Sequence, residues 1–229
     1  MPISPDLSIA LCLRDDESRL ADMAKAAVVV AETLAREYAA GEWTDSSDVE
    51  LSAETREEAS IDGAERVGPK RGIHYELLAL DESSRDNTLS VLSILHAKLP
   101  QLRTIQGLDP GTAIMRAART GEGRVWLFVD APFDPEHGLW ATRQVFCGDR
   151  AAIVPGEVLA VHRNLGQAAL GWLAGGLVSA QHEVETMLEA HGQRPAWSPP
   201  RQRAFRDRAK LFVRGQLGRL GFGQFDRRS

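Results

Sequence analysis

The chain has 229 residues, of which 43% are hydrophobic and 26% are charged. That composition is ordinary for a soluble globular protein, and the length suffices for one large α/β domain or for one domain with an appendage. A formal net charge of −5 argues against a nucleic-acid-binding protein, whose binding surface would be strongly basic. No apolar run approaches the roughly 20 residues of a membrane span. The nearest stretch, residues 165–180, is interrupted by Gln167 and four glycines.

The N-terminus and the cysteines predict a cytoplasmic protein. Residues 1–13 lack the basic start and the long apolar core of a signal peptide. Cys12 and Cys147 each lie in an apolar run, LCL and VFC, so we expect two buried thiols rather than a disulfide. Buried thiols favour a reducing compartment.

Short apolar strands alternate with amphipathic helices over the first two thirds of the chain. The first expected helix, for example, has apolar residues at Leu20, Met23 and Ala27, a spacing that places them on one face. Alternation of this kind predicts an α/β fold with a mainly parallel sheet flanked by helices. The expected strands are residues 7–13, 75–80, 102–105, 125–129, 144–147 and 157–161, and the expected helices are residues 20–39, 89–99 and 111–120.

An acidic segment separates the first helix from the second strand. Residues 41–66 hold nine acidic residues and two arginines, which gives this stretch a net charge of −7. Few large apolar residues accompany these charges, so the segment cannot bury enough surface to offset the entropy cost of ordering it. We therefore expect a mobile surface insertion, which reaches residue 72, just before the second strand.

Carboxylates follow three of the expected strands directly. Asp15, Asp16 and Glu17 come after the first strand, Asp81 and Glu82 after the second, and Asp130 after residues 125–129. In open parallel sheets, ligands bind outside the carboxyl ends of the strands. The sequence therefore predicts a binding site that these side chains share.

The second of these turns carries the most specific motif. Residues 80–88, LDESSRDNT, resemble the turn hydrophobic-Asp-Asp-Gly-Ser-x-Asp-x-Thr of family 2 glycosyltransferases. The residues that match are Asp81, Ser84, Asp86 and Thr88, while Glu82 and Ser83 replace the second Asp and the Gly. Carboxylates at a strand end can accept hydrogen bonds from a nucleobase N–H and from ribose hydroxyls. The alternative is a turn that only caps the following helix.

Two further segments resemble the same family in the same order. In SIALCLRDDESRL, Asp16 stands where the family has the Asn of a Tyr-Asn-Glu turn, and Glu17 matches the Glu. Residues 102–131 resemble the run that leads to the family's metal-binding Asp-x-Asp motif. Together the segments cover residues 7–131. The resemblance implies a GT-A fold, which is Rossmann-like, and a nucleotide sugar of the UDP or GDP type bound by Asp16, Glu17, Asp81, Glu82 and Asp130.

The metal site departs from the family pattern. Asp130 matches the first Asp of Asp-x-Asp, but Pro132 stands in place of the second and has no side-chain oxygen to bind a metal. The segment FDPEHG that follows resembles the polyprenyl-phosphate sugar transferase branch. Mg²⁺ or Mn²⁺ bound by Asp130 is implied by the resemblance and put in doubt by Pro132. Asp134 could replace the lost ligand or could cap the next helix.

Weaker candidates for phosphate binding and for catalysis lie further along the chain. Arg150 and Arg163 follow expected strands, where an arginine can pair with a phosphate or simply face solvent. Glu183 and Glu185 are possible bases for activating a hydroxyl acceptor, although nothing in the sequence singles them out.

The last part of the chain predicts a helical extension. We expect a nucleotide-sugar-binding domain over residues 1–165 and a helical extension over residues 166–229. The tail, residues 201–229, has nine basic and two acidic residues interleaved with apolar ones. Such a segment can pack on the domain, contact the acidic insertion or a protein partner, or lie on the inner face of a membrane.

Three functions remain open at this point. The first is a sugar transferase that uses a nucleotide-diphosphate donor and an unknown acceptor. The second is a catalytically inactive GT-A-like protein that serves as a binding or assembly module, which the changed turn and Pro132 favour. The third is a nucleotidyltransferase-like enzyme, which we rank last because LRDDESRL lacks the glycine-rich basic loop that such an enzyme needs.

Overall fold

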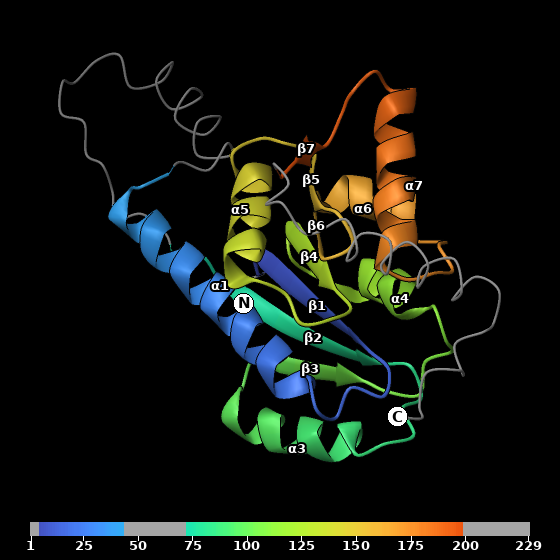
Figure 1. Ribbon diagram of the computed structural model, residues 1–229. Coiled ribbons are helices and arrows are strands. Elements are labelled where there is room, and N and C mark those ends of the chain that lie inside the picture. Colours follow the sequence, from blue (N-terminus) through green and yellow to red (C-terminus); the bar gives the residue numbers. More distant parts are fainter. Residues whose placement is uncertain (1–4, 44–71, 199–229) are drawn as a thin grey trace, which may run out of the picture.

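The computed structural model describes residues 5–43 and 72–198, which form an α/β fold around one mixed sheet (Figure 1). The sheet has seven strands in the order β3-β2-β1-β4-β6-β5-β7. The first four strands of that order run parallel, β6 runs antiparallel to both neighbours, and β7 is parallel to β5. The strands are β1 Leu7–Leu13, β2 Tyr75–Asp81, β3 Leu102–Ile105, β4 Val125–Val129, β5 Ala151–Val154, β6 Val158–His162 and β7 Ala196–Trp197.

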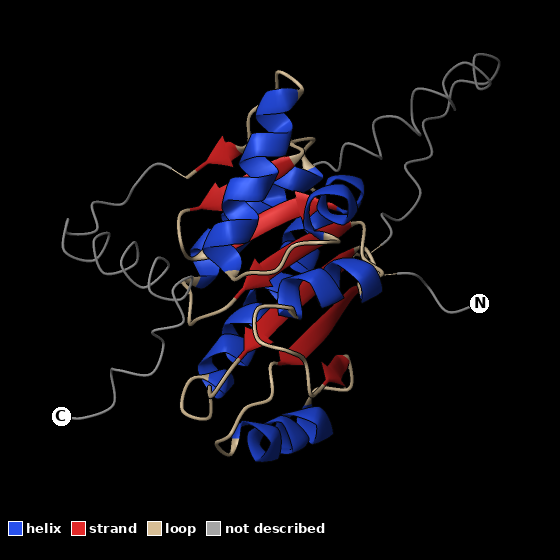
Figure 2. Ribbon diagram, turned by 90° about the vertical axis from the view of Figure 1, so that its right-hand side faces the viewer, coloured by secondary structure: helices blue, strands red, loops and turns tan. Residues whose placement is uncertain are grey.

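Helices cover both faces of the sheet (Figure 2). One face packs against α1, α3 and α5, and the other against α4, α6 and α7. The helices are α1 Leu20–Ala40, α3 Thr88–Lys98, α4 Ala113–Thr120, α5 Pro135–Phe146, α6 Arg163–Leu170 and α7 Leu177–Ala190. Among the described helices, none combines the length and the apolar character that a membrane crossing requires.

Strand β1 lies inside the sheet, between β2 and β4, and this position explains its almost wholly apolar sequence. Leu7, Ile9 and Leu11 belong to the hydrophobic cluster on one face, whereas Ala10 and Cys12 belong to the cluster on the other. A strand that is covered on both faces reads as a continuous apolar run, as LSIALCL does. The predicted α/β class and the mainly parallel sheet are therefore confirmed.

The predicted strand at residues 144–147 is wrong, because that stretch ends helix α5. Asp134 caps this helix by accepting a hydrogen bond from the Glu136 backbone N–H, and Pro135 occupies its first turn. Residues 144–147 thus continue a helix that has already begun. The apolar side chains of Val145 and Phe146 are buried on one face of that helix. Cys12 is buried as expected, but Cys147 at the helix end is exposed, and no disulfide joins the two.

The strand register brings the carboxyl ends of β1, β2 and β4 to one edge of the sheet. Leu13 pairs with Asp81, and Leu11 pairs with Val129, the residue before Asp130. Asp81 and Asp130 therefore lie at the same sheet edge, as the sequence indicates.

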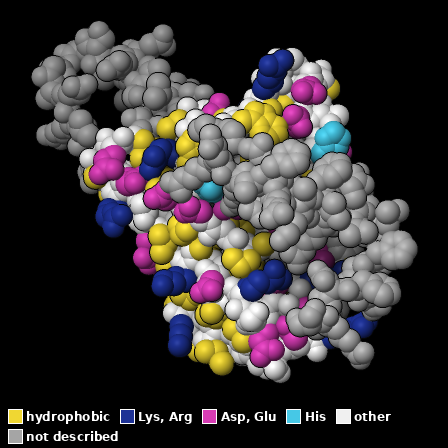
Figure 3. All heavy atoms as spheres, in the orientation of Figure 1, with side chains coloured by type: hydrophobic (Ala, Val, Ile, Leu, Met, Phe, Trp, Pro, Cys, Tyr) yellow, Lys and Arg dark blue, Asp and Glu magenta, His cyan; other side chains and the backbone are white. Residues whose placement is uncertain are grey.

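Several sequence predictions concern residues that are not described. The acidic insertion falls mostly on residues 44–71, and the basic tail falls on residues 199–229, both outside the described part. The boundary expected after residue 165 falls inside α6, and α7 contributes to the same hydrophobic cluster as β4. On the face shown in Figure 3, basic and acidic side chains of the described residues are interspersed rather than gathered in separate patches.

Candidate functional site

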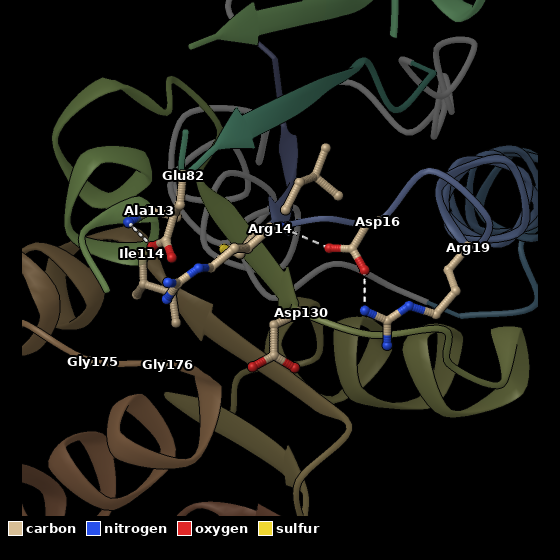
Figure 4. A pocket seen from close by; sticks show the side chains of 11 residues that line it. Arg14, Asp16, Arg19, Glu82, Ala113, Ile114, Asp130, Gly175 and Gly176 are labelled. Carbon is tan, nitrogen blue, oxygen red and sulfur yellow. Dashed lines mark hydrogen bonds and ion pairs between the residues drawn. The ribbon is translucent and has the colours of Figure 1, made fainter. Parts of the chain in front are cut away.

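A pocket of about 170 Å³ opens at the carboxyl ends of β1, β2 and β4 (Figure 4). Its lining includes three carboxylates and two guanidinium groups. Two glycines of the α6–α7 connection complete the wall. The lining residues are Cys12, Leu13, Arg14, Asp16, Arg19, Glu82, Ala113, Ile114, Asp130, Gly175 and Gly176. Because small-molecule sites usually start at about 300 Å³, a whole nucleotide sugar would extend beyond this pocket.

Asp16 enters the pocket wall as a buried carboxylate, with 2% of its surface exposed. One carboxylate oxygen accepts a hydrogen bond from the Arg14 backbone N–H at 2.7 Å, and the other forms an ion pair with the Arg19 guanidinium. A buried charge needs such partners, because desolvation without them is costly. The predicted pocket residue Asp16 therefore lies in the pocket wall, where the backbone of Arg14 and the side chain of Arg19 hold it.

Residues of the motif at 80–88 accept hydrogen bonds from the loop after β1, and we call this set of contacts the clasp. Thr88 Oγ1 accepts from the Asp16 N–H at 2.9 Å, and Asp86 Oδ2 accepts from the Glu17 N–H at 3.0 Å. Burial raises the pKa of Asp86, but hydrogen bonds from the Thr88 hydroxyl and from backbone N–H groups outweigh it and lower the pKa below its ordinary value. The turn thus fixes the position of Asp16, which neither of the two initial interpretations of the motif foresaw.

Glu17 takes part in this clasp instead of lining the pocket. Its carboxylate accepts a hydrogen bond from Asn87 Nδ2 at 3.1 Å on the exposed side of the loop. Asp81 is 1% exposed and accepts from the Ser84 N–H at 3.3 Å, and it does not line the pocket either. These two residues instead bond to the turn that holds the loop after β1.

Glu82 lines the pocket and also caps a helix. Its Oε1 accepts a hydrogen bond from the Ala113 N–H at 2.9 Å, at the start of α4. A carboxylate at this place satisfies a backbone N–H that has no partner within the helix and interacts favourably with the helix dipole. In the resembling motif this position is an Asp, and the longer side chain of Glu82 reaches α4.

Asp130 has the equivalent relationship to α7. Its Oδ2 accepts a hydrogen bond from the Leu177 N–H at 3.2 Å, across the pocket from Glu82. Gly176 lies so close that a Cβ placed there would be 3.5 Å from the same oxygen. Two helix starts therefore meet at the pocket, and each is bonded to one of its carboxylates.

The donor set does not fit a protein-held divalent ion. Pro132 is exposed and supplies no oxygen, and Asp134 caps α5 and does not line the pocket. Over residues 5–43 and 72–198, no group of three or more His, Cys, Asp or Glu side chains is placed to hold a metal. The end of β4 thus carries Asp130 without a second carboxylate at position 132.

Two arginines in the pocket were missed by the sequence interpretation. Arg14 follows β1 directly, and Arg19 precedes α1, both within the segment RDDESR. The signal was present, because two basic residues flank the predicted carboxylates, but an arginine after a strand ordinarily faces solvent.

Cys12 forms part of the pocket floor. Burial raises the pKa of its thiol well above the ordinary value, and the negative charges of Asp130 and Glu82 raise it further. The thiol is therefore held in its neutral form, which is a poor nucleophile and a poor metal ligand.

The remaining candidates lie away from the pocket. Arg150 precedes β5, and Arg163 follows β6. The register places the start of β5 and the end of β6 level with the beginning of β4, whereas Asp130 follows the end of β4. Arg163 donates to the Glu122 carbonyl oxygen at 3.1 Å. Glu183 and Glu185 lie on α7, and neither lines the pocket. The structure does not bring these four residues together with the carboxylates.

The chemistry of the pocket suits a polar, anionic ligand with N–H and hydroxyl groups. The carboxylates can accept hydrogen bonds from such groups, and the guanidinium groups can donate several parallel hydrogen bonds to phosphate oxygens.

Comparisons with known proteins bear on the fold. No protein-family model matches the sequence, and a search of curated proteins finds no match either. Among solved structures, a mannosyltransferase from Pyrobaculum calidifontis in complex with GDP-Man and Mn²⁺ aligns over 100% of this chain and 66% of its own, with 13% identity and a TM-score of 0.55. TarS of S. aureus, residues 1–349, aligns over 94% of this chain and 65% of its own, with 12% identity and a TM-score of 0.48.

At 13% identity, the likeness to the mannosyltransferase shows a shared fold and nothing finer. This chain spans 66% of the length of that protein. The sheet of mostly parallel strands flanked by helices is thus of the kind found in that mannosyltransferase.

Proposed function

We propose that this protein is a sugar transferase that binds a nucleoside-diphosphate sugar over the pocket at the ends of β1, β2 and β4. The single observation that carries the proposal is the convergence of Asp16, Glu82 and Asp130 at that edge. It gains support from the fold shared with a mannosyltransferase that was solved with GDP-Man and from the residues that resemble family 2 glycosyltransferases. The donor is of the UDP or GDP type.

Each carboxylate has a role in this proposal. Asp16 and Glu82 accept hydrogen bonds from the base and the ribose, and Asp130 faces the diphosphate. Asp81 and Glu17 position the loops, since both accept hydrogen bonds from the turn of residues 81–88. These roles follow from which oxygens border the pocket and which are turned away from it.

A divalent ion enters the proposal only in a limited way. The mannosyltransferase was solved with Mn²⁺, and Mg²⁺ or Mn²⁺ would neutralise a leaving diphosphate if it were bound. Asp130 is the one residue of this chain that we would assign to such an ion. Because its donor set does not fit, we assign no step of the reaction to a metal.

A second candidate is a binding module with the same fold and no transfer activity. The observation that favours it is that Asp16, Glu82 and Asp130 all accept hydrogen bonds from the protein itself. A general base must be able to take a proton from the acceptor, and these oxygens are already engaged. A peripheral membrane contact or a protein contact through residues 201–229 stays a prediction from the sequence.

The test is calorimetric titration of the full chain with UDP and GDP, followed by assays of donor hydrolysis and transfer with UDP- and GDP-sugars. We expect binding of one nucleotide and about a tenfold loss of affinity in Glu82→Gln, since an amide cannot accept as many hydrogen bonds as a carboxylate. Glu189→Gln makes the same change on the exposed end of α7 and serves as the matched control.

The outcomes separate the two candidates. Binding with turnover supports the transferase, and binding without turnover of any donor supports the binding module. If neither UDP nor GDP binds, or if both Gln variants bind like the parent, the assignment of this pocket to a nucleotide is wrong.

A further inference from the structure

The end of β4 lacks the ligands that a protein-held metal ion would need, although a diphosphate requires positive charge. Asp130 is the carboxylate at that strand end, and its Oδ2 already accepts the Leu177 N–H at 3.2 Å. Pro132 has no oxygen to offer, and the described residues contain no other group of metal-binding side chains. The charge of a diphosphate has to be met by other groups of the chain.

Arg14 is placed to balance the negative charge of a diphosphate. Its backbone is held by the Asp16 carboxylate at 2.7 Å, while its side chain extends across the pocket toward Glu82 (Figure 4). Within the described residues, no hydrogen bond or ion pair engages the guanidinium. A guanidinium has five N–H donors in a rigid plane and cannot lose its proton in a protein, so Arg14 brings a permanent charge with unused donors to the pocket.

Arg19 adds a second cation on the opposite side. One of its terminal nitrogens pairs with Asp16, but 36% of the side chain is exposed, so other N–H groups still face open space. Arg19 can therefore hold Asp16 and donate to an incoming phosphate oxygen at the same time.

The three carboxylates and two guanidinium groups that line the pocket sum to a formal charge of −1, but the carboxylates are already engaged by donors other than Arg14. Each accepts a hydrogen bond from another group, namely Arg19, the Ala113 N–H and the Leu177 N–H. The last two donors are helix starts, where the partial positive charge of the helix favours an anion. Of the charged groups that line the pocket, Arg14 is the one without such a partner.

We propose that Arg14, assisted by Arg19, binds the diphosphate of the nucleotide in place of a divalent cation, and that Asp130 positions α7 instead of holding a metal. This inference rests on the proposed function, because it assumes that the pocket receives a nucleotide. It goes beyond that function by making nucleotide recognition independent of metal and dependent on an arginine at the end of β1.

The experiment is titration of the full chain with UDP, GDP and the nucleosides uridine and guanosine, each in EDTA and in Mn²⁺. We expect the diphosphate to bind in EDTA within about threefold of its affinity in Mn²⁺. Arg14→Ala should weaken the diphosphate at least about tenfold, as loss of a charge-assisted hydrogen-bond pair does, while the nucleoside is unaffected. Arg36→Ala removes an exposed arginine of α1 and is the matched control.

A second variant tests Asp130. Asp130→Asn keeps an oxygen for the Leu177 N–H but removes the charge, so the diphosphate should bind at least as tightly as to the parent. Unfolding midpoints of all variants check that each is folded.

The results distinguish this inference from the function on which it rests. Diphosphate binding that appears only with Mn²⁺, or that survives Arg14→Ala unchanged, overturns the inference and leaves the proposed function standing. Absence of binding in both conditions removes the proposed function and the inference with it.

Discussion

The carboxylate of Asp130 and the backbone N–H of Leu177 are joined by a hydrogen bond of 3.2 Å between residues 47 positions apart in the chain. The bond links the end of the central strand β4 to the start of α7. Asp130 is therefore a helix cap supplied from another element, and its structural role can be separated from any role toward a ligand.

Asp130→Ala should destabilise the fold, whereas Asp130→Asn should not. The alanine removes the acceptor of the Leu177 N–H, and loss of a cap costs about 1 kcal/mol. The amide oxygen of asparagine keeps the acceptor. Urea unfolding of both variants measures the difference, and equal loss of stability in the two would show that the negative charge, not the hydrogen bond, supports α7.

Pro132→Asp should create a metal response that we expect the parent to lack. Two carboxylates separated by one residue at the end of β4 can hold a divalent ion that also binds a diphosphate. We expect Mn²⁺ to tighten UDP or GDP binding at least about tenfold in this variant, as assistance of this size from a bound cation amounts to roughly 1.4 kcal/mol. Pro132→Ala frees the backbone without adding an oxygen and should show no such response.

A parent protein that already responds to Mn²⁺ as strongly as Pro132→Asp would contradict this prediction. Pro132 is exposed, so the substitution itself should leave the fold intact.

Asp86→Asn should lower stability near neutral pH, and the difference should vanish in acid. The net effect on Asp86 lowers its pKa below 3.8, so the ionised form stabilises the fold. This contribution is fully present above pH 3.8, the ordinary value, and it is lost as the pH falls through the lower folded pKa. Because Asp86 is only partly buried, we expect less than about 1 kcal/mol.

Urea unfolding at a series of pH values from 7 downward measures this difference, with Glu189→Gln as the surface control. A difference in unfolding free energy between the parent and Asp86→Asn that stays constant into strong acid would contradict this prediction. It would mean that the ionised carboxylate does not stabilise the hydrogen bonds between the turn and the loop after β1.

Gly123→Ala should be among the most disruptive single-methyl changes in this chain. A Cβ at Gly123 would lie 2.4 Å from the Ser8 backbone nitrogen and 2.7 Å from the Leu7 carbonyl carbon. Backbone atoms of a central strand cannot move aside, so we expect a loss of about 1–3 kcal/mol. Gly72→Ala, where nothing lies within 4 Å, is the control, and thermal unfolding that ranks the two as equal would disprove the crowding.

The sequence was sufficient for those features that depend on a local pattern. The run from Leu7 to Leu13 is apolar at every position but Ser8, and it is an inner strand with both faces covered. Asp130 could be placed at a ligand-facing sheet edge because it directly follows another such strand. The residues of LDESSRDNT were identified as important, although their pattern alone could not tell a nucleotide contact from a structural one.

The features that the sequence could not supply depend on distant partners. Glu82 caps α4 and Asp130 caps α7 only because the fold brings those helix starts to the sheet edge. Arg14 looks like any surface arginine until the pocket wall is known. The run VFC predicts a strand wrongly, because three apolar residues fit either a strand or the end of a helix. The cap at Asp134, which decides between them, lies a dozen residues earlier.

The contact between Gly111 and Gly175 determines how late in synthesis the pocket can be completed. The Gly175 N–H donates to the Gly111 carbonyl oxygen at 2.8 Å, and Gly175 borders the pocket. The parallel strands β1 to β4 leave the ribosome first, and N-terminal parts of a chain generally fold first. Even so, one wall of the pocket and the helix start bound to Asp130 arrive only with residues 175–177. A nascent chain stalled after α5 would already contain all three pocket carboxylates and both arginines but should not retain a nucleotide.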